Sequence, residues 1–321
     1  MVDLSIIIPI YNGALLLDRC LNNIFSQKSQ YLYEVILIDD GSTDNTVELI
    51  KRRKEPNILL FQQQNAGPAV ARNKGIELAN GKYITFLDAD DYWRQGYIKK
   101  TVDFLETHNE CIAVSVACKN IASFAKCASY NPLWMDDSKE ETPFVLEDFM
   151  SYWATYCHVG TCSTTMRTDS VRQSGGMRTD LRVTEDYEFW LYLSTFGKWG
   201  LILEVLYISD GGDVTQSQGW LSKMERRWKN APSIAEWEKR IVRRLPELTM
   251  SYQKARGRVS RNLTYCQLLS NRLSLSRQEA LRYGNYFIKD PIGKLMNLAK
   301  YTSLTWWMLA KFLKHREYHR K

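Results

Sequence analysis

Two carboxylates, Asp88 and Asp90, stand one residue apart directly after the apolar run 83–87. Two acids at the end of a buried strand can converge on one hard divalent cation, Mn²⁺ or Mg²⁺. A cation held there would bridge the phosphates of a nucleotide and neutralise charge as a diphosphate leaves. A solvated acidic turn is the alternative, and the apolar run in front of the pair favours the metal site.

Polar residues also follow two earlier apolar runs. Tyr11 comes after residues 5–10, and Asp39 comes after residues 33–38. In sheets of parallel strands, ligands bind beyond the carboxyl ends of the strands. Core strands need no acids at their ends, so this placement predicts a binding site along one edge of a sheet.

The spacing of apolar residues predicts the elements that would carry these side chains. The expected strands are 5–10, 33–38, 58–61 and 83–87, and the expected helices are 14–27, 45–54 and 68–78. Asp44 is expected to cap the second helix, and Pro68 stands at the first position of the third, where proline is tolerated. This alternation predicts an α/β fold with a parallel sheet that helices cover on both faces.

The pattern is looser after residue 95. The expected elements are a helix at 95–108, a strand at 112–118, a loop or acceptor-side insertion at 125–143, a strand at 161–166, a helix at 187–193 and a strand at 201–208. From residue 220 onward the chain looks helical. We therefore expect a sheet-containing domain at 1–219 and a helical C-terminal extension at 220–321.

Charge is unevenly distributed along the 321 residues, whose formal net charge is +7. Residues 251–321 carry 15 Lys and Arg against 3 Asp and Glu, whereas the first 250 residues carry 28 against 33. A basic tail on an acidic body predicts that the tail meets an anionic partner. A solvated basic face is the alternative.

The sequence argues against several classes of protein. The seven cysteines are odd in number and include no C-x-x-C pair, which speaks against a disulfide framework and a zinc site. No basic region precedes the short N-terminal apolar run, so we expect no signal peptide. No segment approaches the roughly 20 apolar residues of a membrane span. The fingerprint G-x-G-x-x-G is missing after the first expected strand, which excludes a dinucleotide-binding oxidoreductase.

Five segments in a fixed order resemble the motifs of glycosyltransferase family 2. They are SIIIPIYN at 5–12, VILIDDGSTD at 35–44, NAGPAVARN at 65–73, YITFLDADD at 83–91 and TED at 184–186. The resemblance covers roughly residues 3–208. It implies a GT-A fold, in which helices flank a Rossmann-like, mostly parallel central sheet. It also implies a nucleotide-sugar donor and inversion at the anomeric carbon, with residues 1–219 as the catalytic domain.

The resemblance assigns roles to residues at the expected nucleotide site. Asp39 matches the acid that accepts a hydrogen bond from a uracil ring, for which a carboxylate is suited as a pure acceptor. Tyr11 resembles the residue that lines the base pocket, and Pro9 shapes the same turn. Arg72 resembles a basic residue near the donor, within reach of phosphate. A helix-capping turn is the alternative for Asp39, and a surface arginine is the alternative for Arg72.

The same comparison bears on the expected metal. Asp88 would face the ribose or the metal, Asp90 would bind the metal directly, and Asp91 would cap the next helix. Related enzymes often place a histidine near the end of the domain, and the stretch at 209–215 contains none. Asp213 is the substitute that we expect there, unless phosphates and water complete the metal's ligands.

Asp186 is the expected catalytic base. Inversion needs a single displacement, and a carboxylate would take the proton of the attacking acceptor hydroxyl. A helix start favours the anionic form of that carboxylate. Glu185 would position the acceptor or the backbone. An acid pair that merely begins a helix is the alternative.

These roles predict transfer of a single sugar from a UDP-sugar to an acceptor hydroxyl, in the assembly of bacterial surface polysaccharide. Polymerising synthases carry Gln-x-x-Arg-Trp and membrane spans, whereas the segment 224–228 keeps Arg-Trp without the glutamine. A non-catalytic nucleotide-sugar-binding protein and a sugar nucleotidyltransferase remain as alternatives. The expected partners are the donor and a glycan or lipid-linked acceptor, and no nucleic acid.

The end of the chain predicts where the protein works. Residues 295–321 combine Trp306, Trp307 and other large apolar residues with six lysines and arginines. Tryptophan beside basic residues suits the headgroup level of a bilayer. We therefore expect a cytoplasmic protein that is peripheral on the inner face of the cell membrane. The alternative is that Trp306, Trp307 and Leu309 pack onto the catalytic domain.

Overall fold

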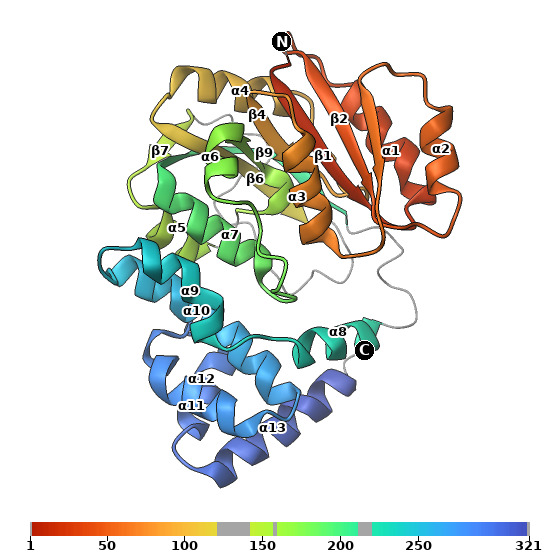
Figure 1. Ribbon diagram of the computed structural model, residues 1–321. Helices are drawn as coiled ribbons and strands as arrows, with labels where there is room; N and C mark the ends of the chain where they lie inside the picture. The colour runs from red at the N-terminus through yellow and green to blue at the C-terminus, as the bar shows by residue number, and fades with distance from the viewer. Residues whose placement is uncertain (1, 121–141, 157–158, 211–219, 320–321) are drawn as a thin grey trace. The chain divides into compact units, whose positions relative to one another are not determined.

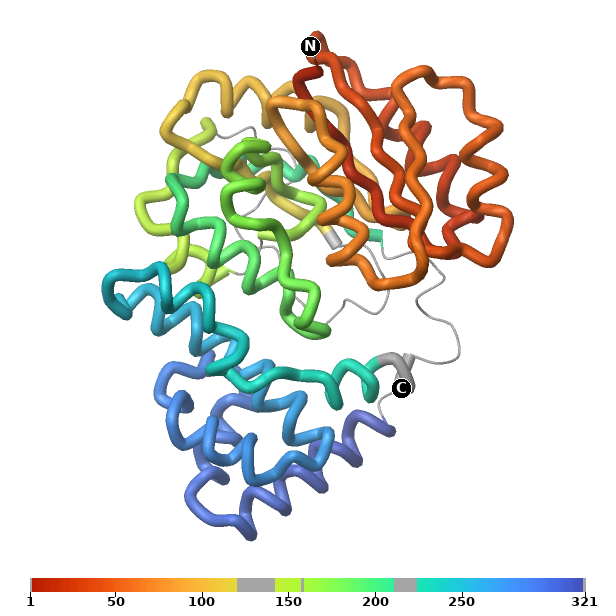
Figure 2. The backbone as a smooth tube through the Cα atoms, viewed as in Figure 1, coloured from red at the N-terminus to blue at the C-terminus, as the bar shows by residue number. Residues whose placement is uncertain are grey.

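The computed structural model describes residues 2–120, 142–156, 159–210 and 220–319 (Figure 1). The chain forms two compact units. The first, called here the sheet unit, comprises Met1–Phe149, Tyr156–Met177 and Tyr192–Thr215. The second, called here the helical unit, comprises Met150–Thr155, Arg178–Leu191 and Gln216–Lys321. The backbone therefore passes between the two units several times, and its course can be followed in Figure 2.

A nine-stranded sheet forms the centre of the sheet unit, with strand order β3-β2-β1-β4-β8-β6-β9-β5 and β7 paired with β9. The strands are β1 (Leu4–Ile10), β2 (Tyr33–Asp39), β3 (Ile58–Gln62), β4 (Tyr83–Phe86), β5 (Tyr92–Trp93), β6 (Cys111–Asn120), β7 (Phe144–Leu146), β8 (Thr164–Arg167) and β9 (Lys198–Ser209). Strands β1 to β4 are mutually parallel, as are β6 and β9, whereas β8, β5 and β7 run the other way.

Helices flank this sheet. They are α1 (Ala14–Phe25), α2 (Thr46–Arg52), α3 (Pro68–Leu78), α4 (Tyr97–Thr107) and α6 (Thr168–Gln173). Successive strand residues point to opposite faces. Ile6 and Ile8 of β1 therefore join the core cluster that holds the buried face of α1, whereas Ile7 points to α3. A Cβ on Gly75 of α3 would lie 2.2 Å from Cγ2 of Ile7, so glycine lets this helix approach the strand closely.

The buried pattern of β1 explains why it lies inside the sheet. Six of its seven residues are buried, because helices cover both faces and leave no solvent side for polar residues. The predicted α/β fold with a mostly parallel sheet flanked by helices is confirmed. Asp44 also acts near its expected place, because its Oδ1 accepts the backbone N–H of Thr46 at the start of α2 (3.0 Å).

The structure corrects several expected boundaries. The helix expected at 14–27 ends at Phe25, and the helix expected at 45–54 is Thr46–Arg52. The strand expected at 161–166 begins only at Thr164, after a 3₁₀ turn. Strands β5 and β7 and helices α5 and α6 were not expected. The expected loop at 125–143 falls almost wholly outside the described residues.

The helical unit contains the helices after residue 220. They are α8 (Trp220–Lys229), α9 (Ile234–Arg244), α10 (Met250–Leu269), α11 (Leu273–Tyr283), α12 (Pro291–Ala299) and α13 (Ser303–Tyr318). Most of α5 (Phe149–Tyr156) and α7 (Glu185–Leu193) also belongs to this unit. The expected helical character of the C-terminal region is confirmed, and the expected boundary between 219 and 220 stays a prediction.

Large aromatic side chains make the core of the helical unit. Trp237, Tyr252 and Trp306 are all at most 1% exposed. Among the residues that the structure describes, no helix combines the length and the apolar character needed to cross a bilayer.

Candidate active site

The parallel strands bring the expected site residues to one edge of the sheet. In the register of β1 and β2, Ile10 lies opposite Asp39, and in that of β1 and β4, Ile7 lies opposite Phe86. The carboxyl edge of the sheet therefore carries Tyr11, Asp39 and the acidic run, by which we mean Asp88, Asp90 and Asp91. This is the edge at which such sheets bind ligands.

Asp39 and Tyr11 lie at the ends of adjacent strands and differ in exposure. Asp39 is 1% exposed, and its Oδ1 accepts the backbone N–H of Ser42 at 3.2 Å. Tyr11 is 52% exposed, so its ring is available to a ligand. Pro9, two residues earlier in β1, is half-buried and pairs with Ile38.

Asn12 fixes the loops that follow β1 and β2. Its Oδ1 accepts the backbone N–H of Thr43 at 2.8 Å, and its own N–H donates to Oγ of Ser42 at 2.9 Å. Asn12 has a φ of 51°, a left-handed conformation that asparagine tolerates better than most residues. The two loops around Tyr11 and Asp39 are thereby held together.

Asp40 has a structural role that the sequence did not reveal. Its carboxylate accepts three hydrogen bonds, from Nε2 of Gln63 (2.8 Å) and from the backbone N–H groups of Ala66 (2.9 Å) and Gly67 (2.8 Å). These bonds hold the loop that leads into α3. Gly67 has a φ of 94°, which favours glycine, and it is followed by Pro68 at the first helical position.

Arg72 of helix α3 lies next to the acidic run. Nη2 of Arg72 lies 2.6 Å from Oδ1 of Asp88. Arg72 is 6% exposed, and its guanidinium lies 5.9 Å from the centre of the Phe86 ring. The alternative of a surface arginine is therefore wrong. A cation paired with one acid of the run is placed to meet further anionic groups there.

The three carboxylates at 88, 90 and 91 crowd one another. Burial and the neighbouring charge of Asp88 raise the pKa of Asp90. Burial, Asp88 and Asp90 together raise the pKa of Asp91 to about 7. Asp91 accepts the hydroxyl of Tyr207 (2.6 Å) and the backbone N–H of Asp210 (2.9 Å), so it ties the run to the end of β9.

The group of possible metal ligands that the structure brings together differs from the expected set. Ligand atoms of Asp88, Asp91 and Cys162 lie within 4.8 Å of one another. Burial and the nearby acids raise the pKa of Cys162, so this residue stays a thiol, and its Sγ accepts the N–H of Asp88 at 3.2 Å. A neutral thiol is a poor ligand for Mg²⁺ or Mn²⁺, which prefer oxygen.

The crowded carboxylates fit a divalent cation. Burial and, after it, the charge of Asp88 raise the pKa of Asp90, and a cation bound between these oxygens would relieve the repulsion between the two carboxylates. Asp88 and Asp90 are the residues that would hold it. Asp213, the third expected ligand, lies outside the described residues.

Arg19 of α1 is a site residue that the sequence did not reveal. Its Nη2 donates to the backbone carbonyl of Asp90 at 2.7 Å, and its Nη1 forms an ion pair with Asp210. The guanidinium also lies 5.7 Å from the centre of the Tyr92 ring. In the sequence Arg19 looks like any charge on the solvent side of an amphipathic helix, so no local signal identifies it.

The expected base and its neighbour belong to the helical unit, where they begin α7. Oδ1 of Asp186 accepts the backbone N–H of Tyr187 at 2.9 Å. Oε2 of Glu185 is buried and has no hydrogen-bond partner among the described residues. Both carboxylates stand in the first turn of the helix, where the helix dipole favours negative charge.

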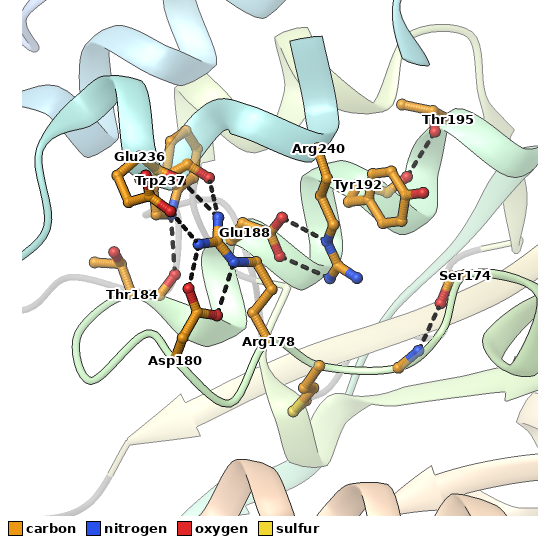
Figure 3. A network of polar contacts seen from close by, with 12 residues as sticks. Ser174, Arg178, Asp180, Thr184, Glu188, Tyr192, Thr195, Glu236, Trp237 and Arg240 are labelled. Carbon is orange, nitrogen blue, oxygen red and sulfur yellow. Dashed lines mark hydrogen bonds and ion pairs between the residues drawn. The ribbon is translucent and has the colours of Figure 1, made fainter. Parts of the chain in front are cut away.

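Helix α9 holds the start of α7 in place (Figure 3). Nε1 of Trp237 donates to the carbonyl of Thr184 at 3.1 Å. Glu188 is fully buried and receives two hydrogen bonds from Arg240, at 2.6 and 2.7 Å. Thr184 has a φ of 60°, a strained conformation for a β-branched residue.

Arg178 adds a second link to the same helix. It donates to the carboxylate of Asp180 and to both the carbonyl (2.7 Å) and the carboxylate (3.0 Å) of Glu236 (Figure 3). The chain just before α7 is therefore fixed to α9 by charged contacts as well as by Trp237. The position of Asp186 depends on these distant partners.

The fold, a mostly parallel sheet flanked by helices, is that of the GT-A glycosyltransferases. The family model "Glycosyl transferase family 2" matches residues 5–172, which is more than half of the chain. The chain belongs to this family.

Relatives of known sequence include a glycosyltransferase and a teichoic acid biosynthesis protein. "Uncharacterized glycosyltransferase YibD" of Escherichia coli K12 is 50% identical over 90 residues, which cover 27% of this chain and 26% of that protein. "Minor teichoic acid biosynthesis protein GgaB" of Bacillus subtilis is 28% identical over 252 residues, which cover 75% of this chain and 26% of that protein. The chain thus matches about a quarter of the length of each of these relatives.

Solved structures show the same fold at low sequence identity. Residues 1–349 of TarS from S. aureus, in complex with UDP-GlcNAc, have a TM-score of 0.59 at 16% identity, over 99% of this chain and 93% of that one. The mannosyltransferase PcManGT from Pyrobaculum calidifontis, in complex with GDP-Man and Mn²⁺, has a TM-score of 0.56 at 17% identity, over 99% and 87%.

Proposed function

We propose that this protein is an inverting glycosyltransferase that moves one sugar from a UDP-sugar to an acceptor hydroxyl. The observation that carries the proposal is the arrangement at the carboxyl edge of β1, β2 and β4. There the buried Asp39, the pair Arg72–Asp88 and the crowded Asp90 follow adjacent parallel strands in a chain of glycosyl transferase family 2.

Asp39 and Tyr11 are proposed to recognise the base. A carboxylate such as that of Asp39 is a pure acceptor, which matches the imide N–H of uracil. The exposed ring of Tyr11 can line the base pocket by stacking or edge contact. Pro9 is proposed to shape this turn, and Arg72 to reach the phosphates.

Asp88 and Asp90 are proposed to hold Mn²⁺ or Mg²⁺. The cation would neutralise charge on the departing diphosphate. The raised pKa of Asp90 supports this role, because burial and the neighbouring charge of Asp88 both disfavour its ionised form when no cation is bound. Arg19 fixes the backbone carbonyl of Asp90 and thereby the direction of that side chain.

Asp186 is proposed as the general base and Glu185 as the residue that positions the acceptor. The first turn of α7 favours negative charge at its acidic side chains, which suits a base. A buried carboxylate oxygen without a hydrogen-bond partner among the described residues is unusual, which supports a functional role for Glu185. In this scheme Asp186 takes the proton of the attacking acceptor oxygen while the sugar leaves its diphosphate.

The acceptor is proposed to be a glycan or a lipid-linked carrier in bacterial surface polysaccharide assembly. The teichoic acid protein GgaB and the relative "Putative teichuronic acid biosynthesis glycosyltransferase TuaG" of Bacillus subtilis support this direction. We further propose that the protein works at the cytoplasmic face of the cell membrane as a peripheral protein, with residues 1–219 as its catalytic domain.

Calorimetry with nucleotides tests the donor. In the presence of Mn²⁺, UDP should bind more tightly than GDP or CMP, and Asp39→Asn should lose that preference because an amide presents a donor as well as an acceptor. Equal binding of all three nucleotides by the parent protein would contradict a UDP-sugar donor. Turnover of a UDP-sugar panel separates an enzyme from a binding protein, which would leave every donor intact.

A further inference from the structure

Large apolar side chains line the outer face of α12 and α13, within the helical unit. Between residues 295 and 312, seven of them are at least 40% exposed: Leu295, Leu298, Tyr301, Leu304, Trp307, Met308 and Phe312. The four in α13 recur at intervals of three and four residues, so they share one side of that helix. We call these seven residues the outer face.

The opposite side of α13 is packed within the helical unit. Trp306, Leu309 and Leu313 are at most 7% exposed, and Nε1 of Trp306 donates to Oγ of Ser276 in α11 at 3.0 Å. The two adjacent tryptophans therefore have different environments, because Trp306 is core and Trp307 is 48% exposed. The α13 part of the outer face therefore lies on the exposed side of a helix whose opposite side packs within the helical unit.

The charge around the outer face is positive. Lys294 and Lys311 are exposed, and Nζ of Lys311 lies 5.6 Å from the centre of the Trp307 ring. Glu317 is the only acid between residues 291 and 319. It is 6% exposed and paired with Arg316, so it offsets none of the charge of the two lysines.

We propose that the outer face of α12 and α13 docks on the surface of an anionic phospholipid bilayer. Trp307 and Tyr301 suit the headgroup level, the aliphatic residues suit the acyl boundary just below it, and Lys294 and Lys311 attract anionic headgroups. The inference rests on the membrane location proposed above, but it does not depend on the sugar-transfer reaction.

Geometry makes α13 lie on the membrane rather than cross it. Its 16 residues span roughly 24 Å at 1.5 Å per residue, less than the roughly 30 Å of a hydrocarbon core. The opposite side of α13 also contacts α11, because Trp306 donates a hydrogen bond to Ser276 of that helix. A second copy of the chain is a less suitable partner, because a two-fold contact would bring the basic residues of both copies together.

Flotation with phospholipid vesicles tests the proposal on the 321-residue chain. The protein should float with phosphatidylglycerol-containing vesicles and not with phosphatidylcholine alone. It should detach near 1 M salt, where the Debye length falls to about 3 Å. Trp307→Ser with Phe312→Ser should abolish flotation, and Lys311→Glu should weaken it about fivefold or more, from roughly 1 kcal/mol per basic residue.

The matched control is Leu248→Ser with Met250→Ser. These residues are 41% and 57% exposed in the same unit but lie outside α12 and α13, so this variant should float as the parent does. Unchanged flotation of the Trp307 and Phe312 variant would overturn the assignment of this face. A parent protein that ignores anionic vesicles, or that forms a dimer which the same variant abolishes, would also overturn it. Calorimetry with UDP would still report on the proposed reaction.

Discussion

Asp40 and Asp90 both follow apolar strands at the same edge of the sheet, yet their surroundings differ. Asp40 receives three hydrogen bonds that fix the loop before α3. Asp90 has a raised pKa because burial and Asp88 both oppose its charge. The first carboxylate is therefore satisfied by the protein, whereas the second is suited to an external cation.

Replacing Asp186 tests whether the proposed base and the proposed metal ligand, Asp90, have separate roles. Asp186→Asn should lower the rate of transfer by about 10²–10⁴-fold, the usual cost of losing a general base, and leave UDP affinity nearly intact. Steady-state kinetics and calorimetry measure the two quantities. As the comparison, Asp90→Asn should lose the part of UDP binding that depends on Mn²⁺. Near-normal turnover of Asp186→Asn would place the base elsewhere.

From short motifs the sequence predicted site residues such as Asp39, Asp88 and Asp90, and the structure places these three at the carboxyl edge of the sheet. The sequence did not identify Arg19 or Cys162, and it gave Asp91 a capping role where the structure ties it to Tyr207 of β9. Those contacts join residues that lie far apart in the chain. Pairings of this kind depend on the strand order, which local spacing does not encode.

At the scale of elements, helix α9 positions the start of α7. Glu188 is fully buried, and Arg240 supplies its charge partner through two hydrogen bonds. A buried carboxylate that loses its partner is costly, because it has already given up its hydration.

Arg240→Ala should therefore destabilise the helical unit by about 3–5 kcal/mol, as expected when one member of a buried pair is removed. Burial already raises the pKa of Glu188, so the loss should shrink as the pH falls and the carboxyl takes up a proton. Urea unfolding at several pH values measures both effects. Arg243→Ala, an exposed site on the same helix, should change stability by no more than about 0.5 kcal/mol.

The two strands that the sequence missed are short. Strand β5 has two residues and β7 has three, too few for a period of two to be visible. Both strands pair with β9. Their extended conformation therefore depends on hydrogen bonds to β9 and not on the apolar pattern of their own residues. The long apolar runs of β1 and β2 were predicted nearly to the residue, because burial on both faces demands such runs.

At the scale of the whole molecule, the adjacent Trp306 and Trp307 have different roles. Trp306 contributes to folding stability because it is buried, whereas Trp307 lies on the surface. Trp306→Ala should cost about 3–5 kcal/mol, because it removes a buried side chain, whereas Trp307→Ala should cost no more than about 0.5 kcal/mol. Thermal unfolding followed by circular dichroism compares the two variants. UDP binding at the sheet unit should survive both substitutions. A large loss in Trp307→Ala would mean that this side chain belongs to the core.

The interleaving of the two units has a consequence for synthesis on the ribosome. Strands β1 to β4 and the acids at their ends leave the ribosome early, and domains tend to form as the chain emerges. The turn before Glu185 and Asp186 has to wait, because Trp237 and Arg240 are translated about fifty residues after it. A nascent chain can therefore assemble its nucleotide-side sheet while the acids of α7 are still unsupported. In the reaction proposed above, with Asp186 as the base, translation itself would keep the chain from acting on an acceptor before α9 is complete.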